Sequence, residues 1–226
     1  TYAHVDKISE MYGIEIVKLN NGDVPTLVKK HKRFPSDAAR FCTDSLKIQV
    51  GKAFYKQLAQ EQGQGFEVWY GMRTGESSQR EKRYAGIVCD EVMPPHCFMP
   101  SKYPQYLAKL GIMIRLPVVD WSTEDIFEFV GDELNPLYKM GFDRVGCFPC
   151  LAGGDYWKAK AFGFDDFGKS QRIQVVQLAH EIKKNVYTTK SYSSKIENLD
   201  LMVQTKRKSK LLHDDLFDAP CMMCHI

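Results

Sequence analysis

The chain has 226 residues, of which 44% are hydrophobic and 26% are charged, and its formal net charge is +3. This length allows one sizeable globular domain, or a core with a small appendage. No apolar run approaches the roughly 18 residues that cross a bilayer, and so small a net charge does not by itself indicate nucleic-acid binding.

The seven cysteines are an odd number, which excludes a complete set of disulfides. The chain begins "TYAHVDKISE", which does not have the pattern of a secretory signal peptide. We therefore expect a cytoplasmic protein with no membrane association. In that reducing compartment, paired cysteines favour metal binding or catalysis over structural crosslinks.

The first half of the chain predicts helices and strands in turn. Apolar residues at helical spacing predict a helix over residues 2–12, which Gly13 ends. The alternating stretch "IEIVKLN" predicts a strand over residues 14–20, and a second helix is expected within residues 45–63. The aromatic stretch "FEVWYGM", residues 66–72, is typical of a buried strand.

A polar loop is expected over residues 73–83, followed later by a strand within residues 112–121. Ser122 and Asp125, three positions apart, predict the capped start of a helix that runs to residue 130. Beyond Cys150 the pattern is mainly helical, with one amphipathic helix over residues 171–186. Strands that alternate with helices at this spacing predict an α/β fold with a largely parallel sheet.

Two CxxC pairs are the most specific metal-binding pattern in the chain. Cys147 and Cys150 lie in "GCFPC", and Cys221 and Cys224 lie in "PCMMC" near the end. Two such pairs can form one four-thiolate site, because each turn directs two sulfurs at one ion. Two separate reactive or buried pairs remain the alternative, and the spacing does not decide between them.

A second pattern predicts an anion-binding site. The stretch "GMRTGESSQR" follows an apolar strand directly and contains Arg73 and Arg80 among small residues. Ligands of open α/β sheets bind beyond the carboxyl ends of the strands, and arginine matches phosphate or sulfate oxygens with two parallel donors. Arg40 and Lys47, near the start of a helix, could strengthen this site. The alternative is a charged surface loop. The basic runs "KKHKR" (residues 29–33) and "KRKSK" (206–210) are solvated surfaces or phosphate-binding segments.

Four stretches together resemble the phosphoadenosine-phosphosulfate reductase family of the adenine-nucleotide α-hydrolase (PP-loop) superfamily. They are "RFCTDSLK", "GMRTGESSQR", "LPVVDWSTEDIFEFV" and "NPLYKMGFDRVGCFPC", in this order. The likeness runs from the start of the chain to about Asp155. The family that it indicates also includes proteins that load sulfur for DNA phosphorothioation. It implies a Rossmann-like sheet with helices on both faces, with a nucleotide-binding domain over residues 1–155 and a helical extension over residues 156–226.

The resemblance also implies the ligands and the chemistry. It implies a [4Fe–4S] cluster on Cys42, Cys147, Cys150 and either Cys224 or Cys221, with zinc as the alternative metal. It implies ATP or another adenine nucleotide, bound by the residues that match the family's motifs: Arg40, Lys47, Arg73, Glu76, Ser77 and Arg80. The implied activity is sulfur transfer, nucleotide α-hydrolysis or sulfonucleotide reduction. The alternative is a non-catalytic metal-binding scaffold in a complex that acts on DNA.

Two departures from the family pattern bear on catalysis. The Ser-Gly-Gly-x-Asp-Ser phosphate loop, which precedes these motifs in the family, is absent from the sequence as given. The tail "PCMMCHI" differs from the Glu-Cys-Gly-Leu-His tail that holds the nucleophile of the reductases. Cys221 and Cys224 are thus the candidate nucleophiles in the tail, and sulfur transfer or nucleotide α-hydrolysis is favoured slightly over reduction. A protein partner in such a complex is also expected.

Overall fold

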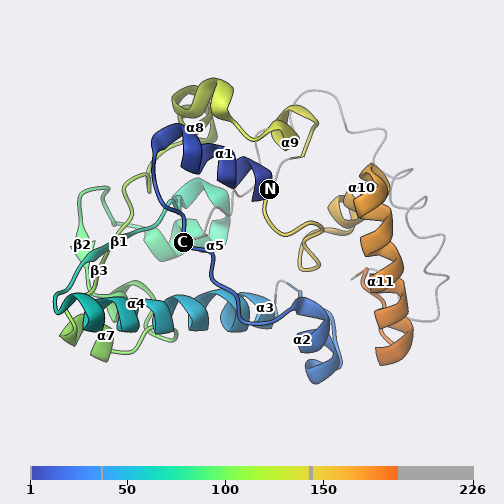
Figure 1. Ribbon diagram of the computed structural model, residues 1–226, viewed down its shortest axis with the longest axis horizontal. Coiled ribbons are helices and arrows are strands. Elements are labelled where there is room, and N and C mark those ends of the chain that lie inside the picture. Colours follow the sequence, from blue (N-terminus) through green and yellow to red (C-terminus); the bar gives the residue numbers. More distant parts are fainter. Residues whose placement is uncertain (1, 37, 143–144, 188–226) are drawn as a thin grey trace. The chain divides into compact units, whose positions relative to one another are not determined.

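The computed structural model describes residues 2–36, 38–142 and 145–187 (Figure 1). The described residues form two compact units, each built from separate stretches of chain. The first unit contains residues 2–20, 47–142 and 145, and the second contains residues 21–36, 38–46 and 146–187. The sequence analysis expected a nucleotide-binding domain over residues 1–155 and a helical extension over residues 156–226. That division was based on family likeness, and it stays a prediction.

A small mixed sheet lies in the first unit. Its strands are β1 (Glu67–Trp69), β2 (Val92–Met93) and β3 (Met113–Arg115), in the order β1-β3-β2. β1 and β3 are parallel, with Val68 opposite Ile114, whereas β2 is antiparallel to β3. The expected α/β class is confirmed, and the expectation of a largely parallel sheet holds for one of these two pairings.

Most of the described helices belong to the first unit. They are α1 (Tyr2–Tyr12), α4 (Gln49–Gln62), α5 (Ser78–Tyr84), α6 (Pro95–Phe98), α7 (Tyr106–Lys109), α8 (Thr123–Val130) and α9 (Pro136–Lys139). Figure 1 shows α4 and α7 beside each other on one side of the sheet. The core joins Val68 and Ile114 of the sheet to Tyr55 of α4, Tyr84 of α5 and Leu107 of α7.

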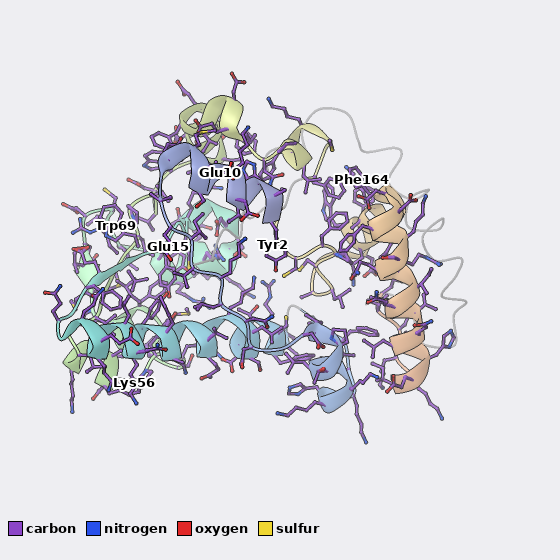
Figure 2. All side chains as sticks on the ribbon, in the orientation of Figure 1. Tyr2, Glu10, Glu15, Lys56, Trp69 and Phe164 are labelled. Carbon is purple, nitrogen blue, oxygen red and sulfur yellow. The ribbon has the colours of Figure 1, made fainter. Side chains whose placement is uncertain are left out.

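One face of the sheet is buried and the other is open at β1. Val68 is 3% exposed, whereas its neighbour Trp69, labelled in Figure 2, is 61% exposed. Glu67 also lies on the open side, where its carboxylate accepts hydrogen bonds from Arg115 of β3 at 2.8 and 3.2 Å. The sequence indicated a fully buried strand here, but β1 buries only alternate side chains.

Three helix ends follow the sequence prediction. Gly13 ends α1 with φ +62°, and Gly63 ends α4 with φ +66°, a left-handed conformation that glycine adopts without strain. At α8, Ser122 accepts a hydrogen bond from the Asp125 N–H at 3.0 Å, and Asp125 accepts one from the Ser122 N–H at 2.7 Å. This reciprocal capping box confirms the predicted start of the helix.

Two local predictions were wrong. Residues 14–20 do not form a strand, although they alternate in polarity. Ile14 and Val17 are exposed, so burial of apolar side chains does not stabilise a strand here. Residues 73–83 do not form an irregular loop but a 3₁₀ turn, η2 (Thr74–Glu76), followed by α5. The helix begins here because the Ser77 hydroxyl accepts a hydrogen bond from the Arg80 N–H at 3.3 Å.

The second unit is helical. It contains α2 (Val24–His31), α3 (Phe41–Thr43), α10 (Asp155–Phe164) and α11 (Asp166–Ile182), and a π-helical turn, η1 (Asp44–Ile48), follows α3 and precedes α4. The core of this unit contains Val28, Leu151, Phe162 and Leu178. α10 and α11 approach closely at Gly168, where any Cβ would lie 2.1 Å from the Ala161 carbonyl oxygen. The helix predicted over residues 171–186 is confirmed as α11, which begins earlier, at Asp166, and ends at Ile182.

Candidate nucleotide and cluster sites

The carboxyl ends of β1 and β3 stay together beyond the strands. The Tyr70 N–H donates to the Arg115 carbonyl at 3.0 Å, and the Thr74 N–H donates to the Val119 carbonyl at 2.8 Å. These bonds bring the segment after β1 beside the segment that leads from β3 into α8. This is the edge of the sheet at which α/β proteins bind ligands.

Arg73 is buried at this edge. It is 3% exposed, and its guanidinium donates to the Trp121 carbonyl oxygen at 3.1 Å and to the Thr123 hydroxyl at 3.3 Å. A surface loop would have left the side chain in water, so the alternative of a charged surface loop is wrong for this residue. Trp121 and Thr123 position Arg73, and sequence analysis did not identify either residue. The capping box of Ser122 and Asp125, which lies beside them in the sequence, is the motif that could have drawn attention to this segment.

The buried Glu76 and the half-buried Arg80 form an ion pair one helical turn apart. Glu76 is 2% exposed, and its Oε1 has no hydrogen-bond partner among the described residues. A carboxylate that has lost its water needs donors, because leaving a charged group both buried and unsatisfied is costly. The Glu76 carboxylate therefore has an acceptor oxygen with no partner among the described residues, at the edge where α/β proteins bind ligands.

The structure brings four of the six predicted nucleotide-binding residues together. Arg73, Glu76, Ser77 and Arg80 follow one another on the segment from β1 through η2 into α5. Lys47 is half-buried in η1, and Arg40 is exposed at the start of α3 in the second unit. The strand-edge cluster, as we call Arg73, Glu76, Ser77 and Arg80, is thus defined within the first unit alone.

The three predicted cluster ligands described by the structure all lie in the second unit. Cys42 is half-buried in α3, Cys147 is exposed, and Cys150 is half-buried in the turn before α10. Burial raises the pKa of the Cys42 thiol above its ordinary value, and the thiols of Cys147 and Cys150 raise it further.

The turn around Cys150 is tight. The Gly153 N–H donates to the Cys150 carbonyl at 3.0 Å, and a Cβ on Gly153 would lie 3.1 Å from that oxygen and 3.9 Å from the Cys150 sulfur. Aromatic rings lie on the same segment, since Phe148 contacts Phe164 and Phe167 with ring centroids 6.1 and 6.2 Å apart. Thiols in a partly apolar environment suit iron–sulfur ligation.

Among residues 2–36, 38–142 and 145–187, no group of three or more His, Cys, Asp or Glu side chains is arranged to hold a metal ion. Cys221 and Cys224, the predicted source of a fourth ligand and the candidate nucleophiles, lie outside the described residues. Cys89 and Cys97 are exposed and belong to the first unit, whereas the three candidate ligands belong to the second.

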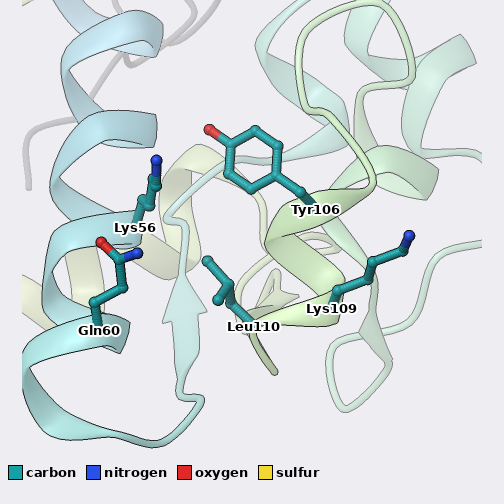
Figure 3. Close-up of a pocket in the computed structure, with 5 residues that line it drawn as sticks. All are labelled: Lys56, Gln60, Tyr106, Lys109 and Leu110. Carbon is teal, nitrogen blue, oxygen red and sulfur yellow. The ribbon is translucent and has the colours of Figure 1, made fainter.

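A pocket of about 400 Å³ lies on the other side of the first unit, between α4 and α7 (Figure 3). Its lining residues are Lys56, Gln60, Tyr106, Lys109 and Leu110. Gln60 precedes β1 and Leu110 precedes β3, so the pocket lies toward the amino ends of the strands. It contains none of the predicted site residues and does not belong to the strand-edge cluster.

Comparison with known proteins agrees with the resemblance in the sequence. Residues 1–152 match the model of the phosphoadenosine phosphosulfate reductase domain. The α/β class of the first unit agrees with this domain. The chain belongs to the phosphoadenosine phosphosulfate reductase domain family.

Two curated relatives are similar to part of the chain. An uncharacterized 37.8 kDa protein of Escherichia phage 186 is 29% identical over 141 residues, which cover 61% of this chain and 37% of the relative. An uncharacterized protein of Methanocaldococcus jannaschii is 27% identical over 155 residues, which cover 67% of this chain and 28% of the relative. The chain thus matches about a third of the length of these relatives, and no solved structure matches it.

None of the helices within the described ranges combines the length and the apolar character needed to cross a membrane.

Proposed function

We propose that the chain binds an adenine nucleotide at the strand-edge cluster and a [4Fe–4S] cluster in the second unit. It would act in sulfur transfer or nucleotide α-hydrolysis, or else in sulfonucleotide reduction. The observation that carries the proposal is that Arg73 and Glu76 are buried, with Glu76 paired to Arg80, beyond the carboxyl end of a strand in a family domain.

The strand-edge cluster suits the anionic part of a nucleotide. The Arg73 guanidinium is held in place by Trp121 and Thr123, so it would lose little conformational freedom when it meets an anion. Arg80 can offer forked donors to phosphate or sulfate oxygens, while Glu76 fixes its orientation. Ser77 caps α5 and can also offer a hydroxyl proton to the ligand.

The metal part of the proposal rests on the donor chemistry. Cys42, Cys147 and Cys150 would hold the cluster, with Cys224 or Cys221 as the fourth ligand. When bound, a [4Fe–4S] cluster supplies electron transfer or a site for sulfur. Binding of a metal by these cysteines would release their thiol protons, because the thiolate is the form that ligates metal. Zinc is the alternative metal for the same set.

Anaerobic purification followed by iron, sulfide and zinc analysis tests this assignment. The wild-type protein should contain about four irons and four sulfides per chain, the content of one such cluster. Cys42→Ser should lose most of this iron, whereas Cys97→Ser, which changes an exposed cysteine of the first unit, should retain it. One zinc per chain with no sulfide would contradict the iron–sulfur assignment.

A double substitution, Cys221→Ser with Cys224→Ser, identifies the source of the fourth ligand. We expect the iron content and the melting temperature to fall together, because loss of a ligand is also loss of folding free energy. Full iron content in this variant would show that the fourth ligand lies elsewhere.

A further inference from the structure

The basic run "KKHKR" at the end of α2 has no role in the proposed nucleotide or cluster sites. Lys29, Lys30 and His31 form the last turn of α2, and Lys32 and Arg33 follow it. The side chains of all five residues are exposed. Basic residues in the last turn of a helix interact favourably with the helix dipole. That effect falls off within the turn, so it does not explain the presence of Arg33 beyond the end of α2.

The structure adds a second group of cations to this run. α2 packs against α11, and Lys29 forms a 2.8 Å ion pair with Glu181 near the end of α11. This pair joins the carboxyl ends of the two helices, which lie beside each other in Figure 1. Lys183 and Lys184, directly after α11, are also exposed. We call Lys29–Arg33 with Lys183 and Lys184 the helix-end surface.

The charge of the helix-end surface is strongly one-sided. It contains six lysines and arginines, and Glu181, already paired with Lys29, is the one acidic residue in the stretches 28–36 and 178–187. Asp155, at the start of α10 in the same unit, forms a 2.9 Å ion pair with the buried Lys158, so its charge is also matched. Five cations therefore remain beyond the Lys29–Glu181 pair.

Backbone conformation separates this surface from an ordinary solvated helix end. Lys32 and Lys183 occupy left-handed positions, with φ +51° and +53°, and among the described residues they are the non-glycine residues with positive φ. Glycine or asparagine is the usual residue at such a position, because a side chain there is strained. Both helices end instead in a strained lysine, and both lysines lie on the same surface.

We propose that the helix-end surface binds the phosphate backbone of a nucleic acid. A single phosphate accepts only a few donors, whereas cations that extend over two helix ends match a repeating polyanion. The surface belongs to the second unit alone and does not include the strand-edge cluster, so this proposal does not rest on the nucleotide site. Binding of this kind reads no base sequence, since phosphate contacts position a protein without specifying a site.

A fourfold substitution tests the proposal: Lys30, Lys32, Lys183 and Lys184 each replaced by Gln. The matched control replaces Lys7, Lys56, Lys109 and Lys139, four exposed lysines of the first unit, and so changes the net charge equally. Binding of a labelled 20-base-pair DNA duplex is measured by anisotropy between about 50 and 200 mM salt, the range over which phosphate contacts weaken strongly. Melting curves establish that each variant is folded.

We expect the helix-end variant to bind DNA at least about tenfold more weakly than the control. The slope of log affinity against log salt should become shallower by about 3 to 4, since each phosphate contact contributes about 0.9. Equal weakening in the two variants would overturn the proposal, and so would a wild-type protein that binds no duplex at the lowest salt. Binding to anionic lipid vesicles without binding to DNA would overturn it as well.

Discussion

In the first unit, two of the candidate nucleotide-binding residues are fully buried, whereas in the second unit the candidate metal ligands are less enclosed. Arg73 and Glu76 are 3% and 2% exposed, and Arg73 is bonded to the segment that enters α8. Cys147 is exposed, and Cys42 and Cys150 are half-buried. Burying a charge requires partners in the apo protein, whereas a thiol is a small, weakly polar group that folding alone does not have to satisfy.

This difference has a consequence for stability. Substitution in the strand-edge cluster should destabilise the fold even without nucleotide. Substitution of a cysteine should act mainly through the loss of the metal, because metal binding to a site that the fold only partly organises contributes its free energy to folding.

The largest effect is expected for Glu76→Ala, which removes the buried carboxylate that pairs with the half-buried Arg80 guanidinium. Removing one partner of a fully buried pair costs about 3–5 kcal/mol, and Arg80 is partly exposed, so the free energy of unfolding should fall by up to that amount in denaturant titrations. Glu81→Ala, at an exposed position of the same helix, is the control and should cost less than about 1 kcal/mol. Equal effects would show that the Glu76–Arg80 pair is not organised in the apo protein.

A smaller effect is expected for Tyr70→Phe in the core beneath the same strand end. The Tyr70 hydroxyl lies 2.9 Å from that of Tyr55 and 2.7 Å from that of Tyr103, in a buried chain of three. Removing the central hydroxyl should cost about 1–3 kcal/mol, because both neighbours lose their shared partner. Tyr84→Phe should cost less, since the Tyr84 hydroxyl donates to the Met72 sulfur, a weak acceptor. Thermal unfolding of the two variants provides the comparison.

The smallest effect is a pH dependence at the start of α8, where Asp125 caps the helix that holds Arg73. The hydrogen bond from the Ser122 N–H lowers the pKa of the Asp125 carboxyl below its ordinary 3.8. A lowered folded-state pKa contributes stability that is present above the unfolded value and is lost as the pH falls through the folded value. The stability difference between wild type and Asp125→Asn should therefore shrink as the pH falls from 6 to below about 4. A difference that stays constant over this range would contradict this cause.

The sequence predicted the helix ends well because those signals are local. Gly13, Gly63 and the Ser122–Asp125 pair act through the backbone within a few residues, and each lies where the pattern placed it. The strand over residues 14–20 failed for the opposite reason. Alternating polarity stabilises a strand only if a neighbouring strand and a buried face are present, and those depend on the tertiary fold.

The strand-edge cluster could be predicted as a set of residues but not as a buried one. The position of Arg73 after an apolar strand was visible in the sequence, whereas its bonds to Trp121 and Thr123 join segments nearly fifty residues apart. Hydropathy treats "RTGESSQREKR" as a surface loop, because it counts charges without their partners. For the helix-end surface, the sequence showed the basic run "KKHKR" but not its neighbours. Lys183 and Lys184 join that run only because α2 packs on α11.

The most direct test of the nucleotide site is a calorimetric titration of the full chain with ATP, using two variants of α5. Arg80→Lys retains the charge beside Glu76 but loses the planar fork, whereas Arg83→Lys makes the same change at an exposed position of the same helix. We predict that wild type binds ATP, that Arg80→Lys weakens binding at least tenfold, about 1.4 kcal/mol, and that Arg83→Lys stays within about twofold. A wild-type protein that does not bind ATP, or equal affinities in the two variants, would contradict the assignment of the strand-edge cluster.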